Sequence, residues 1–477
     1  MDLSTDITLQ TEHIHWLTKD QAWHYRVLPK GKENNTLQLF CEDGADQYSL
    51  LSELEILLGQ DVALQPLASS QIARLLSTYY IKQSAATSGA ARLQADNADD
   101  FLMNLIGEAK NLKSSDIHIE SYESKCRVRI RIDGMMVERY LLERADYPAL
   151  INKIKILANL DIAEKRLPQD GRIAYKFGDQ QFDIRASVLP TLHGEKVVLR
   201  LLNNDATEID LNTLGFSKTD LENYLQGAKR PNGILLISGP TGSGKTTTLY
   251  ATLKLLNKEI RNILTIEDPI EYTLEGVNQV QLKESIGLTF AAALRTFLRQ
   301  DPDVIMVGEI RDVDTANMAI RAALTGHLVL STIHTNSAWG TVSRLIDMGI
   351  PPFLVASTLN TTVAQRLIRQ LCPHCKEKQP FTTELYPRQF KPFVEVQSHY
   401  VAKGCEHCFY TGYKGRKAVY EVIPVDQDLA LEIKNGNMYI QNLLKEKGIQ
   451  SLAENAFNLF SEGLTSIEEI YPLLFNY

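Results

Sequence analysis

A chain of 477 residues is too long for one ordinary hydrophobic core, so we expect two to four domains. Its 50 lysines and arginines against 58 aspartates and glutamates leave a formal net charge of −8, which argues against a general nucleic-acid binder. The first residues lack the positive start of a secretory signal, and no window reaches the roughly 18 consecutive apolar residues of a membrane-spanning helix. Any membrane role is therefore expected to be peripheral.

Residues 1–83 mix short strand-like and helical pieces and predict a small N-terminal domain in which we see no chemistry. Residues 84–98 are small and polar, and they are the best linker candidate in the first half of the chain. The isolated Cys41 is expected to be a small buried hydrophobic residue, as is Cys126 further on.

Residues 99–203 predict a compact α+β domain that begins with a periodic helix and continues with strands. In one of these strands, apolar residues alternate with Arg127, Arg129 and Arg131, so one face is apolar and the other basic. We interpret the basic face as solvated, with a phosphate or protein contact as the alternative. A second polar connector, residues 204–215, follows.

Residues 216–477 predict an α/β domain, because short apolar runs alternate with helical patterns. The expected strands are GILLIS, ILTIED, VIMVGE and LVLSTIH, and the expected helices are 245–258, 289–300, 312–325 and 338–348. This alternation indicates a largely parallel sheet covered on both faces. In such sheets the ligand lies outside the carboxyl ends of the strands.

The stretch GPTGSGKT, residues 239–246, has the spacing of a phosphate-binding loop between a strand and a helix. Its glycines let successive backbone amides face an anion, and the following helix directs the positive end of its dipole at that anion. Lys245 is expected to reach the β- and γ-phosphates and Thr246 to ligate Mg²⁺; a glycine-rich surface turn is the alternative. The predicted nucleotide-binding residues are Gly239, Pro240, Thr241, Gly242, Ser243, Gly244, Lys245, Thr246 and Thr247.

Polar residues follow the other predicted strands. Glu309 is our first choice for positioning or activating the attacking water, and a pair with Arg311 is the alternative. Gly308 stands where many P-loop enzymes carry an aspartate, so less carboxylate help for Mg²⁺ is expected. His334 ends the fourth strand, where it is placed to sense the γ-phosphate, whereas His327 is more simply a core residue.

The acidic cluster of Glu267, Asp268 and Glu271 would repel itself unless a cation lies among its members. Ordering of Mg²⁺ or water is one interpretation, and a loop cap is the other. Two arginine pairs offer positive charge: Arg295 with Arg299 on one helical face, and Arg185 with Arg200 in the preceding domain. If that domain packs over the site, its arginines would act as arginine fingers; surface salt bridges are the alternative.

Residues 371–410 contain two C-x-x-C pairs, formed by Cys372, Cys375, Cys405 and Cys408. In a chain without a secretion signal this pattern suggests metal rather than disulfides. Four thiolates suit a structural Zn²⁺ site with no open position, and iron remains an alternative. His374 or His407 is a less favoured replacement for one cysteine.

Together these motifs resemble the hexameric secretion ATPases of the general secretion pathway E type, which drive type II secretion and type IV pilus assembly. GPTGSGKTTTLY is similar to the family's Walker A box, TIEDPIEY to its aspartate box, LRQDPDVIMVGEIRD to its Walker B box and GHLVLSTIHTNSA to its histidine box. SSDIHIE, DIAEKRLPQDGRI, AQRLIRQLCPHC and GYKGRKAVYE also look like family sequence. The resemblance covers about residues 99–470.

The resemblance implies a RecA-like P-loop ATPase domain, a PAS-like arginine-bearing domain before it, and ATP, Mg²⁺ and Zn²⁺ as cofactors. It implies a cytoplasmic homohexamer that is peripheral to the inner membrane and works on platform proteins there. It implies catalytic roles for Glu309, Lys245, Glu267, His334, Arg185, Arg200, Arg295 and Arg299. The tetracysteine module favours an assembly or secretion motor over a retraction motor, which lacks it.

Two other classes of function remain open from the sequence. One is a nucleic-acid motor for DNA uptake or conjugation, against which stands the net charge of −8. The other is a scaffold that binds ATP without useful turnover. No cyclic-dinucleotide-binding motif is evident in the first 80 residues.

Overall fold

The computed structural model describes residues 13, 16–17, 19–33, 36–43, 47–69, 71–72, 75–76, 98–177, 180–202 and 210–475. Backbone proximity groups the chain into two compact units, one of Met1–Ala90 with Lys403–Gly412 and one of Ala91–Ala402 with Tyr413–Tyr477. Most of the two predicted linkers, 84–97 and 204–209, lies outside the described residues, so the predicted domain boundaries stay predictions. No helix of the described ranges is both long and apolar enough to span a membrane.

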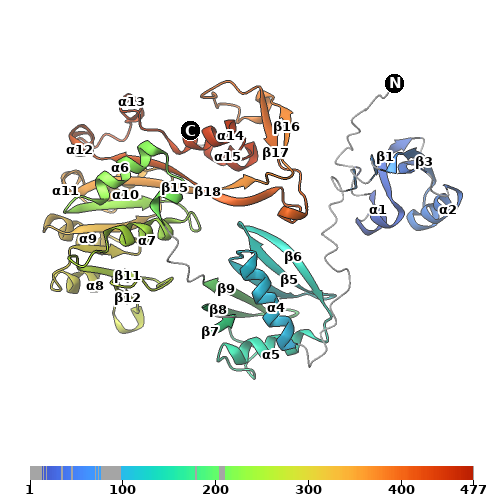
Figure 1. Cartoon of the computed structure of the whole chain (residues 1–477), viewed down its shortest axis with the longest axis horizontal. Helices are drawn as coiled ribbons and strands as arrows, with labels where there is room; N and C mark the ends of the chain where they lie inside the picture. Colours follow the sequence, from blue (N-terminus) through green and yellow to red (C-terminus); the bar gives the residue numbers. More distant parts are fainter. Residues whose placement is uncertain are drawn as a thin grey trace. The chain divides into compact units, whose positions relative to one another are not determined.

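The N-terminal elements form a small three-stranded sheet of order β1-β2-β3 with two helices (Figure 1). Cys41 is fully buried in the core of this sheet, as its isolated position predicted. The elements are α1 (Lys19–Tyr25), β1 (Val27–Glu33), β2 (Thr36–Glu42), α2 (Gln47–Leu58) and β3 (Val62–Leu67).

The next elements form a six-stranded antiparallel sheet of order β6-β5-β4-β9-β8-β7. One face carries the alternating apolar residues, including Val128 and Ile130, and packs with residues of both helices into one core. Cys126 is fully buried there. The elements are α4 (Ala98–Asn111), β4 (Asp116–Ser121), β5 (Cys126–Ile132), β6 (Met135–Leu142), α5 (Tyr147–Leu157), β7 (Gln169–Phe177), β8 (Gln180–Thr191) and β9 (Gly194–Leu202).

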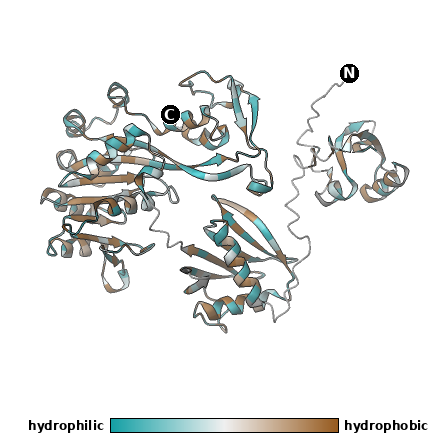
Figure 2. Cartoon of the chain, in the orientation of Figure 1, coloured by the Kyte–Doolittle hydropathy of each residue, from teal (hydrophilic) through white to brown (hydrophobic). Residues whose placement is uncertain are grey.

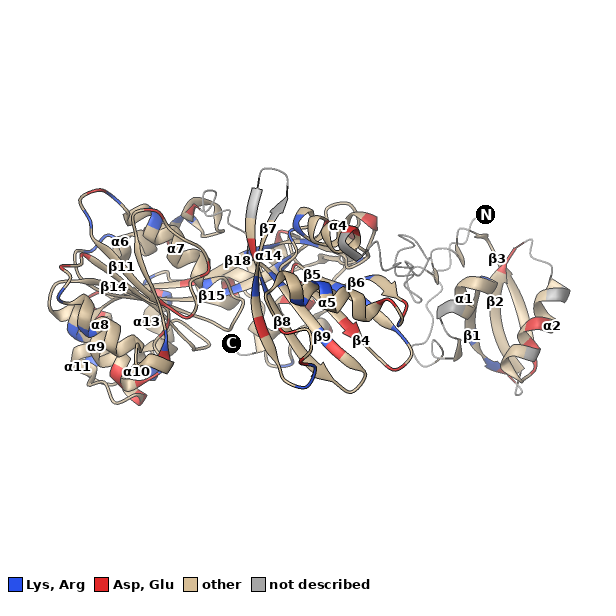
Figure 3. Cartoon of the chain, turned by 90° about the horizontal axis from the view of Figure 1, so that it is seen from below, with Lys and Arg blue, Asp and Glu red and all other residues tan. Residues whose placement is uncertain are grey.

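The opposite face of this sheet is charged, and it is not simply a solvated basic face as predicted. Arg127 and Arg129 both donate to Glu120 of β4, at 3.0 and 2.8 Å, and Arg131 lies 3.6 Å from Asp116. Figure 3 shows basic and acidic segments side by side on these strands. The prediction failed because the partners come from a neighbouring strand, and pairing across strands cannot be read from one strand alone.

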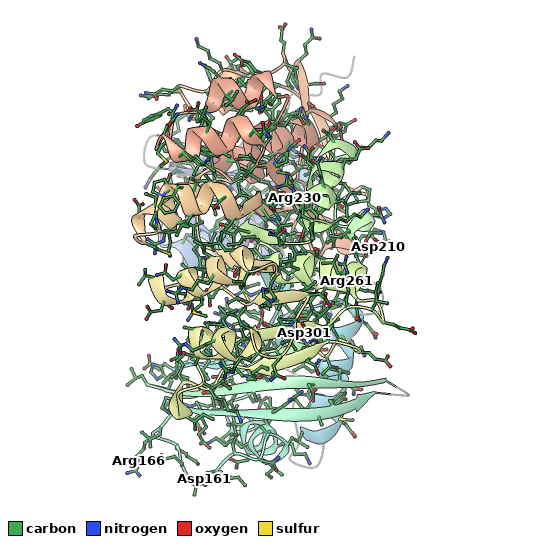
Figure 4. The ribbon with its side chains drawn as sticks, turned by 90° about the vertical axis from the view of Figure 1, so that its left-hand side faces the viewer. Asp161, Arg166, Asp210, Arg230, Arg261 and Asp301 are labelled. Carbon is green, nitrogen blue, oxygen red and sulfur yellow. The ribbon has the colours of Figure 1, made fainter. Side chains whose placement is uncertain are left out.

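The loop after α5 is anchored on its inner side. Lys155 is fully buried, donates to the Glu164 carbonyl oxygen at 2.6 Å and pairs with Glu195 of β9 at 2.5 Å. Asp161 and Arg166 of the same loop point outward (Figure 4), and the Arg166 side chain is 89% exposed. The loop therefore has a fixed base and a charged outer rim.

The remaining elements build an α/β domain around a seven-stranded sheet of order β12-β11-β13-β14-β10-β15-β18, in which only β18 runs antiparallel to its neighbour among the described pairs. The first half comprises α6 (Lys218–Ala228), β10 (Gly233–Ser238), α7 (Lys245–Leu256), β11 (Ile263–Glu267), β12 (Asn278–Gln281), α8 (Phe290–Phe297), β13 (Val304–Val307), α9 (Val313–Leu324) and β14 (Leu328–Ile333). The second half comprises α10 (Gly340–Asp347), α11 (Pro352–Thr358), β15 (Leu359–Leu371), β16 (Glu377–Pro380), β17 (Ser398–Val401), β18 (Tyr413–Pro424), α12 (Gln427–Lys434), α13 (Gln441–Glu446), α14 (Leu452–Ser461) and α15 (Ile467–Phe475).

Both faces of this sheet are buried, as the apolar runs predicted. Leu235 and Ile237 of β10 pack into a core shared with α6 and α7, whereas Ile234 and Leu236 pack into a core shared with α8 to α11 and α14. The strands β10, β11, β13 and β14 are buried along their whole length and are largely apolar (Figure 2). Both faces of β10 are covered, which is why GILLIS shows no alternation of apolar and polar residues.

The register brings the strand ends to one edge. Ser238 pairs with Ile333, Val307 with Ser331, and Ile266 with Val307. The loops after β10, β11, β13 and β14 therefore leave the sheet together.

The central strand offers a test of this packing. Leu236→Ala should lower the free energy of unfolding by about 2–5 kcal/mol, because it opens a cavity in a core that collapses only partly. Leu431→Ala, at a site 56% exposed on α12, should change it by less than about 0.5 kcal/mol. Denaturant unfolding of the full chain measures both, and equal effects would contradict the burial of β10.

Candidate active site

The loop between β10 and α7 needs glycine at its two ends. A Cβ built on Gly239, whose φ is 150°, would lie 2.5 Å from the Gln365 carbonyl oxygen. Gly244 is the N-cap of α7 and has a φ of 86°. Other residues would be strained at both positions, so the tight turn depends on these glycines.

This loop carries donors without protein partners. α7 has no side-chain cap at its N-terminus, so the amides of its first turn are available to an anion. Ser243 is 3% exposed and its hydroxyl has no hydrogen-bond partner among the described residues. A buried polar group of this kind is costly unless a ligand completes it, so the loop fits the phosphates of a nucleotide.

Lys245 begins α7 and folds back over the loop. Its Nζ donates to the carbonyl oxygens of Gly239 and Pro240 at 2.8 and 2.9 Å. Burial lowers the pKa of Lys245, and Glu309 opposes that shift. The ammonium group therefore lies on the loop that is predicted to bind the β- and γ-phosphates. The neighbouring Thr246 is exposed, so its hydroxyl is accessible to a metal ion.

Glu309 follows β13 at the same edge and is held from two sides. Arg311 donates to one of its carboxylate oxygens, and His334 Nε2, at the end of β14, lies 3.3 Å from the other. The Glu309 side chain is only 14% exposed. The structure thus contains the Arg311 pair considered as the alternative, and it places Glu309 beside His334 as well.

Gly308 has a packing reason for being glycine. A Cβ there would lie 3.3 Å from the Ile266 carbonyl oxygen and 3.5 Å from the Glu267 Cα of the neighbouring strand. A side chain here would therefore need a small shift of the neighbouring strand, and with glycine in place this position supplies no carboxylate to a metal ion.

Glu267 is buried beneath the site, at 3% exposure. Its carboxylate accepts from the Tyr250 hydroxyl, from Thr265 at 2.6 Å and from Gln279 at 3.0 Å. Burial and the adjacent Glu267 charge raise the pKa of Tyr250 well above its usual range. Glu267 therefore joins α7, β11 and β12 in one network, and its role toward a metal ion or water stays a prediction.

The four predicted arginines are not gathered at the loop. Arg185 donates to the Ile270 carbonyl oxygen at 2.9 Å and lies 3.5 Å from Glu271, so it contacts the acidic segment after β11. Arg200 pairs with Asp116 at 2.9 Å. Arg295 on α8 and Arg299 just after it are exposed, and among the described residues neither they nor Arg200 bonds to residues 239–246.

His327 lies at the opposite edge from Lys245. Its backbone oxygen accepts from Gly233, where β10 begins, and its Nδ1 lies 2.8 Å from the Ala322 carbonyl oxygen. This position fits a structural residue at the end of α9.

Residues of β15 contact the loop and escaped prediction. Gln365 is 2% exposed, donates to the Ser243 carbonyl oxygen at 2.8 Å and accepts from Thr248 of α7 at 2.9 Å. The stretch AQRL offers one signal, because Gln365 and Arg366 interrupt the short apolar run from Val363 to Ile368. Without the strand order, nothing in that stretch indicates which loop it contacts.

The four cysteines of residues 371–410 converge. The sulfur atoms of Cys372, Cys375, Cys405 and Cys408 all lie within 4.8 Å of one another, with Cys405 and Cys408 3.8 Å apart. Bonds of about 2.3 Å in a tetrahedron separate sulfurs by roughly 3.8 Å, so the set fits a tetrathiolate metal site. Backbone amides of Cys405 and Gly412 each donate to the Cys408 sulfur at 3.2 Å, which favours a thiolate there. Among the described residues His374 and His407 are not members of this cluster.

Fold and site together define a P-loop ATPase of the RecA-like α/β class. Residues 93–472 match the family model described as Type II/IV secretion system protein, and the chain belongs to this family. The Type II secretion system ATPase E of Vibrio cholerae is 45% identical over 370 residues, which are 77% of this chain and 73% of that protein. The Type IV pilus assembly ATPase PilB of Myxococcus xanthus is 40% identical and covers 98% of this chain and 87% of its own length.

Solved structures show the same fold. The Legionella pneumophila ATPase DotB covers 82% of this chain and 98% of its own, with a TM-score of 0.62 at 20% identity. The pilus retraction motor PilT, solved with bound ADP, covers 78% of this chain and 96% of its own, with a TM-score of 0.53 at 27% identity. The chain is thus an ATP-hydrolysing enzyme of the secretion ATPase family, as the motifs predicted.

The buried amide of Gln365 can be tested apart from the phosphate ligands. Gln365→Met keeps the volume but removes the donor to the Ser243 carbonyl oxygen and leaves the Thr248 hydroxyl with only its longer contacts, to the Tyr420 hydroxyl at 3.3 Å and the Gly244 carbonyl oxygen at 3.4 Å. We expect the dissociation constants of ADP and of a non-hydrolysable ATP analogue to rise together by about tenfold, because both nucleotides use the same loop. Isothermal titration calorimetry measures both, and unchanged affinities would show that the loop keeps its shape without this amide.

Proposed function

We propose that the chain is a cytoplasmic ATPase motor that powers assembly of a pilus or pseudopilus, in type IV pilus biogenesis or type II secretion. The observation that carries the proposal is the meeting of Lys245, Glu309 and His334 at the edge of a parallel sheet where a glycine loop opens onto a helix N-terminus. The names of the two relatives above support both machines equally. Inner-membrane platform proteins are the proposed partners, with contact to the membrane itself only peripheral.

The proposed division of labour follows the contacts. Lys245 and the amides of residues 239–247 bind the phosphates, and Thr246 with water holds Mg²⁺, which neutralises charge on the phosphates when bound. Glu309 orients or activates the attacking water. His334 contacts Glu309, so it can report the state of the phosphate end to the loop that follows β14.

The arginines act on closure in this proposal. Arg295 and Arg299 are exposed residues of the nucleotide domain itself, whereas Arg185 and Arg200 of the preceding domain hold carbonyl or carboxylate partners that a phosphate can replace. Closure of the arginine-bearing domain, within one subunit or across a ring of six, would bring this charge to the nucleotide. Glu267 supports the site from below by fixing the segment after β11.

The metal module is proposed to bind one Zn²⁺ through its four cysteines, in a structural role. It would fix the excursion of the chain between β15 and β18 rather than take part in hydrolysis. Iron suits the same thiolates, and metal analysis decides between the two.

Two substitutions test the hydrolytic assignment. Lys245→Ala should abolish turnover, because the phosphates lose their ammonium partner, whereas Glu309→Gln should lower kcat by about 10²- to 10⁴-fold and leave binding of an ATP analogue within about threefold. Lys258 is exposed and lies two residues after the end of α7, so Lys258→Ala serves as the control and should keep normal activity. Normal hydrolysis in either site variant would refute the assignment, and strong stimulation by DNA would favour a nucleic-acid motor instead.

Removal of one thiol tests the metal proposal. Cys375→Ser should reduce bound zinc from one ion per chain and lower the melting temperature, because a structural metal stabilises the fold that holds it. His374→Ala should keep the zinc. Elemental analysis of the purified full chain measures the content, and full zinc in the Cys375 variant would mean that this sulfur is not a ligand.

A further inference from the structure

β15 extends beyond β10 to the level of the phosphate-binding loop. Ser238, the last residue of β10, pairs with Ala364, so Gln365 and Arg366 lie just past the end of β10. Their side chains belong to opposite faces of the sheet, as alternation in a strand requires. Gln365 supports the loop from the α7 side, and Arg366 lies on the side of the loop that follows β14.

The Arg366 guanidinium is held by carbonyl oxygens rather than by carboxylates. It donates to the carbonyl oxygen of Gln365 at 2.9 Å and to that of Asn336 at 3.0 Å. It is half-buried, and among the described residues it forms no ion pair. Asn336 lies two residues after His334, so this arginine touches the segment that carries the proposed phosphate sensor.

The acid whose charge acts on Arg366 is a poor counter-ion. Glu421 of β18 is 7% exposed and accepts from the backbone amides of Ala338 and Leu452 at 3.0 and 3.2 Å. Burial raises its pKa, and it only partly offsets the burial that lowers the pKa of Arg366. The positive charge of Arg366 is therefore incompletely neutralised by the chain itself.

Arg366 and Lys245 border the same short segment. Lys245 contacts the carbonyl oxygens of Gly239 and Pro240, and a Cβ on Gly239 would lie 3.1 Å from a terminal nitrogen of Arg366. Arg366 and Pro240 both line one cavity of about 550 Å³. Two half-buried cations whose side-chain hydrogen bonds, among the described residues, all go to carbonyl oxygens form a site that an anion stabilises.

We propose that Arg366 is a second cation for the terminal phosphate of ATP, supplied by the same chain, and that it makes the site prefer ATP to ADP. This inference rests on the proposed ATPase function. ADP lacks the outermost phosphate, so Lys245 serves both nucleotides while Arg366 serves ATP. Arg366 also donates to the Asn336 carbonyl oxygen. Loss of the terminal phosphate therefore changes the contacts of the segment that follows His334.

Nucleotide preference separates this role from simple support of the loop. In the full chain with Mg²⁺, Arg366→Gln should raise the dissociation constant of a non-hydrolysable ATP analogue by about 10- to 100-fold and leave that of ADP within about threefold. Arg366→Met, which keeps the stem, should behave alike and carries the test if the glutamine variant is unfolded. Arg366→Lys should recover part of the preference, because a point charge replaces the planar fork.

Arg369→Gln is the matched control. Arg369 lies on the same strand but pairs with Glu469, so its loss should leave the ratio of the two affinities unchanged. Equal weakening of ATP analogue and ADP by the neutral Arg366 variants would assign Arg366 to loop support alone, and wild-type affinities would remove it from the site; either result overturns the inference. If the wild-type chain bound neither nucleotide, the proposed function itself would fail, which is a distinct result.

Discussion

The buried amide of Gln365 is the contact on which the geometry of the nucleotide site most depends. It joins the Ser243 carbonyl in the loop to Thr248 in α7, so the two halves of the phosphate cradle are fixed to one strand. Gln365 pairs in register with Tyr420 of β18, whose hydroxyl lies 3.3 Å from the same Thr248. The phosphate cradle is therefore held in place by side chains of two strands, β15 and β18, in addition to its own backbone.

The same two strands border the cysteine module. β15 ends at Leu371, one residue before Cys372, and β18 begins at Tyr413, shortly after Cys408. A long excursion between paired strands would loosen their ends, and a metal clip limits that loss because it shortens the free loop. With the proposed metal bound, the module would support the strands that hold the nucleotide loop, and the proposal assigns it no catalytic part.

Electrostatics explain how the catalytic edge is held before nucleotide enters. Glu309 has Arg311 on one side and His334 on the other, and its charge supports the ammonium form of Lys245 against burial. Arg311 is also within the influence of Asp268 and Glu284. The acids and cations of this edge thus neutralise one another within the chain. When a phosphate replaces one partner of a pair, the remaining partner is free to pair with another group of this edge.

Sequence reasoning reached the parallel sheet, the loop and the strand-end residues, because each leaves a local signal. GILLIS is apolar throughout since both its faces are buried, and Glu309 and His334 each follow a similar run. It missed Gln365 and Arg366, whose partners are set by which strands lie side by side. It also misjudged Arg127 and Arg129, whose partner Glu120 lies across the sheet. The spacing of residues along one helix or strand can be read from the sequence. Contacts between strands depend on the strand order of the sheet, which the sequence alone does not give.

We propose that closure over ATP bound at residues 239–246 also stabilises the ring of six subunits. Solution mass by multi-angle light scattering, with and without Mg²⁺ and a non-hydrolysable ATP analogue, tests this most directly. In the presence of the analogue, the measured mass should be that of six chains of 53.7 kDa each. A single-chain mass that does not respond to saturating analogue would contradict it.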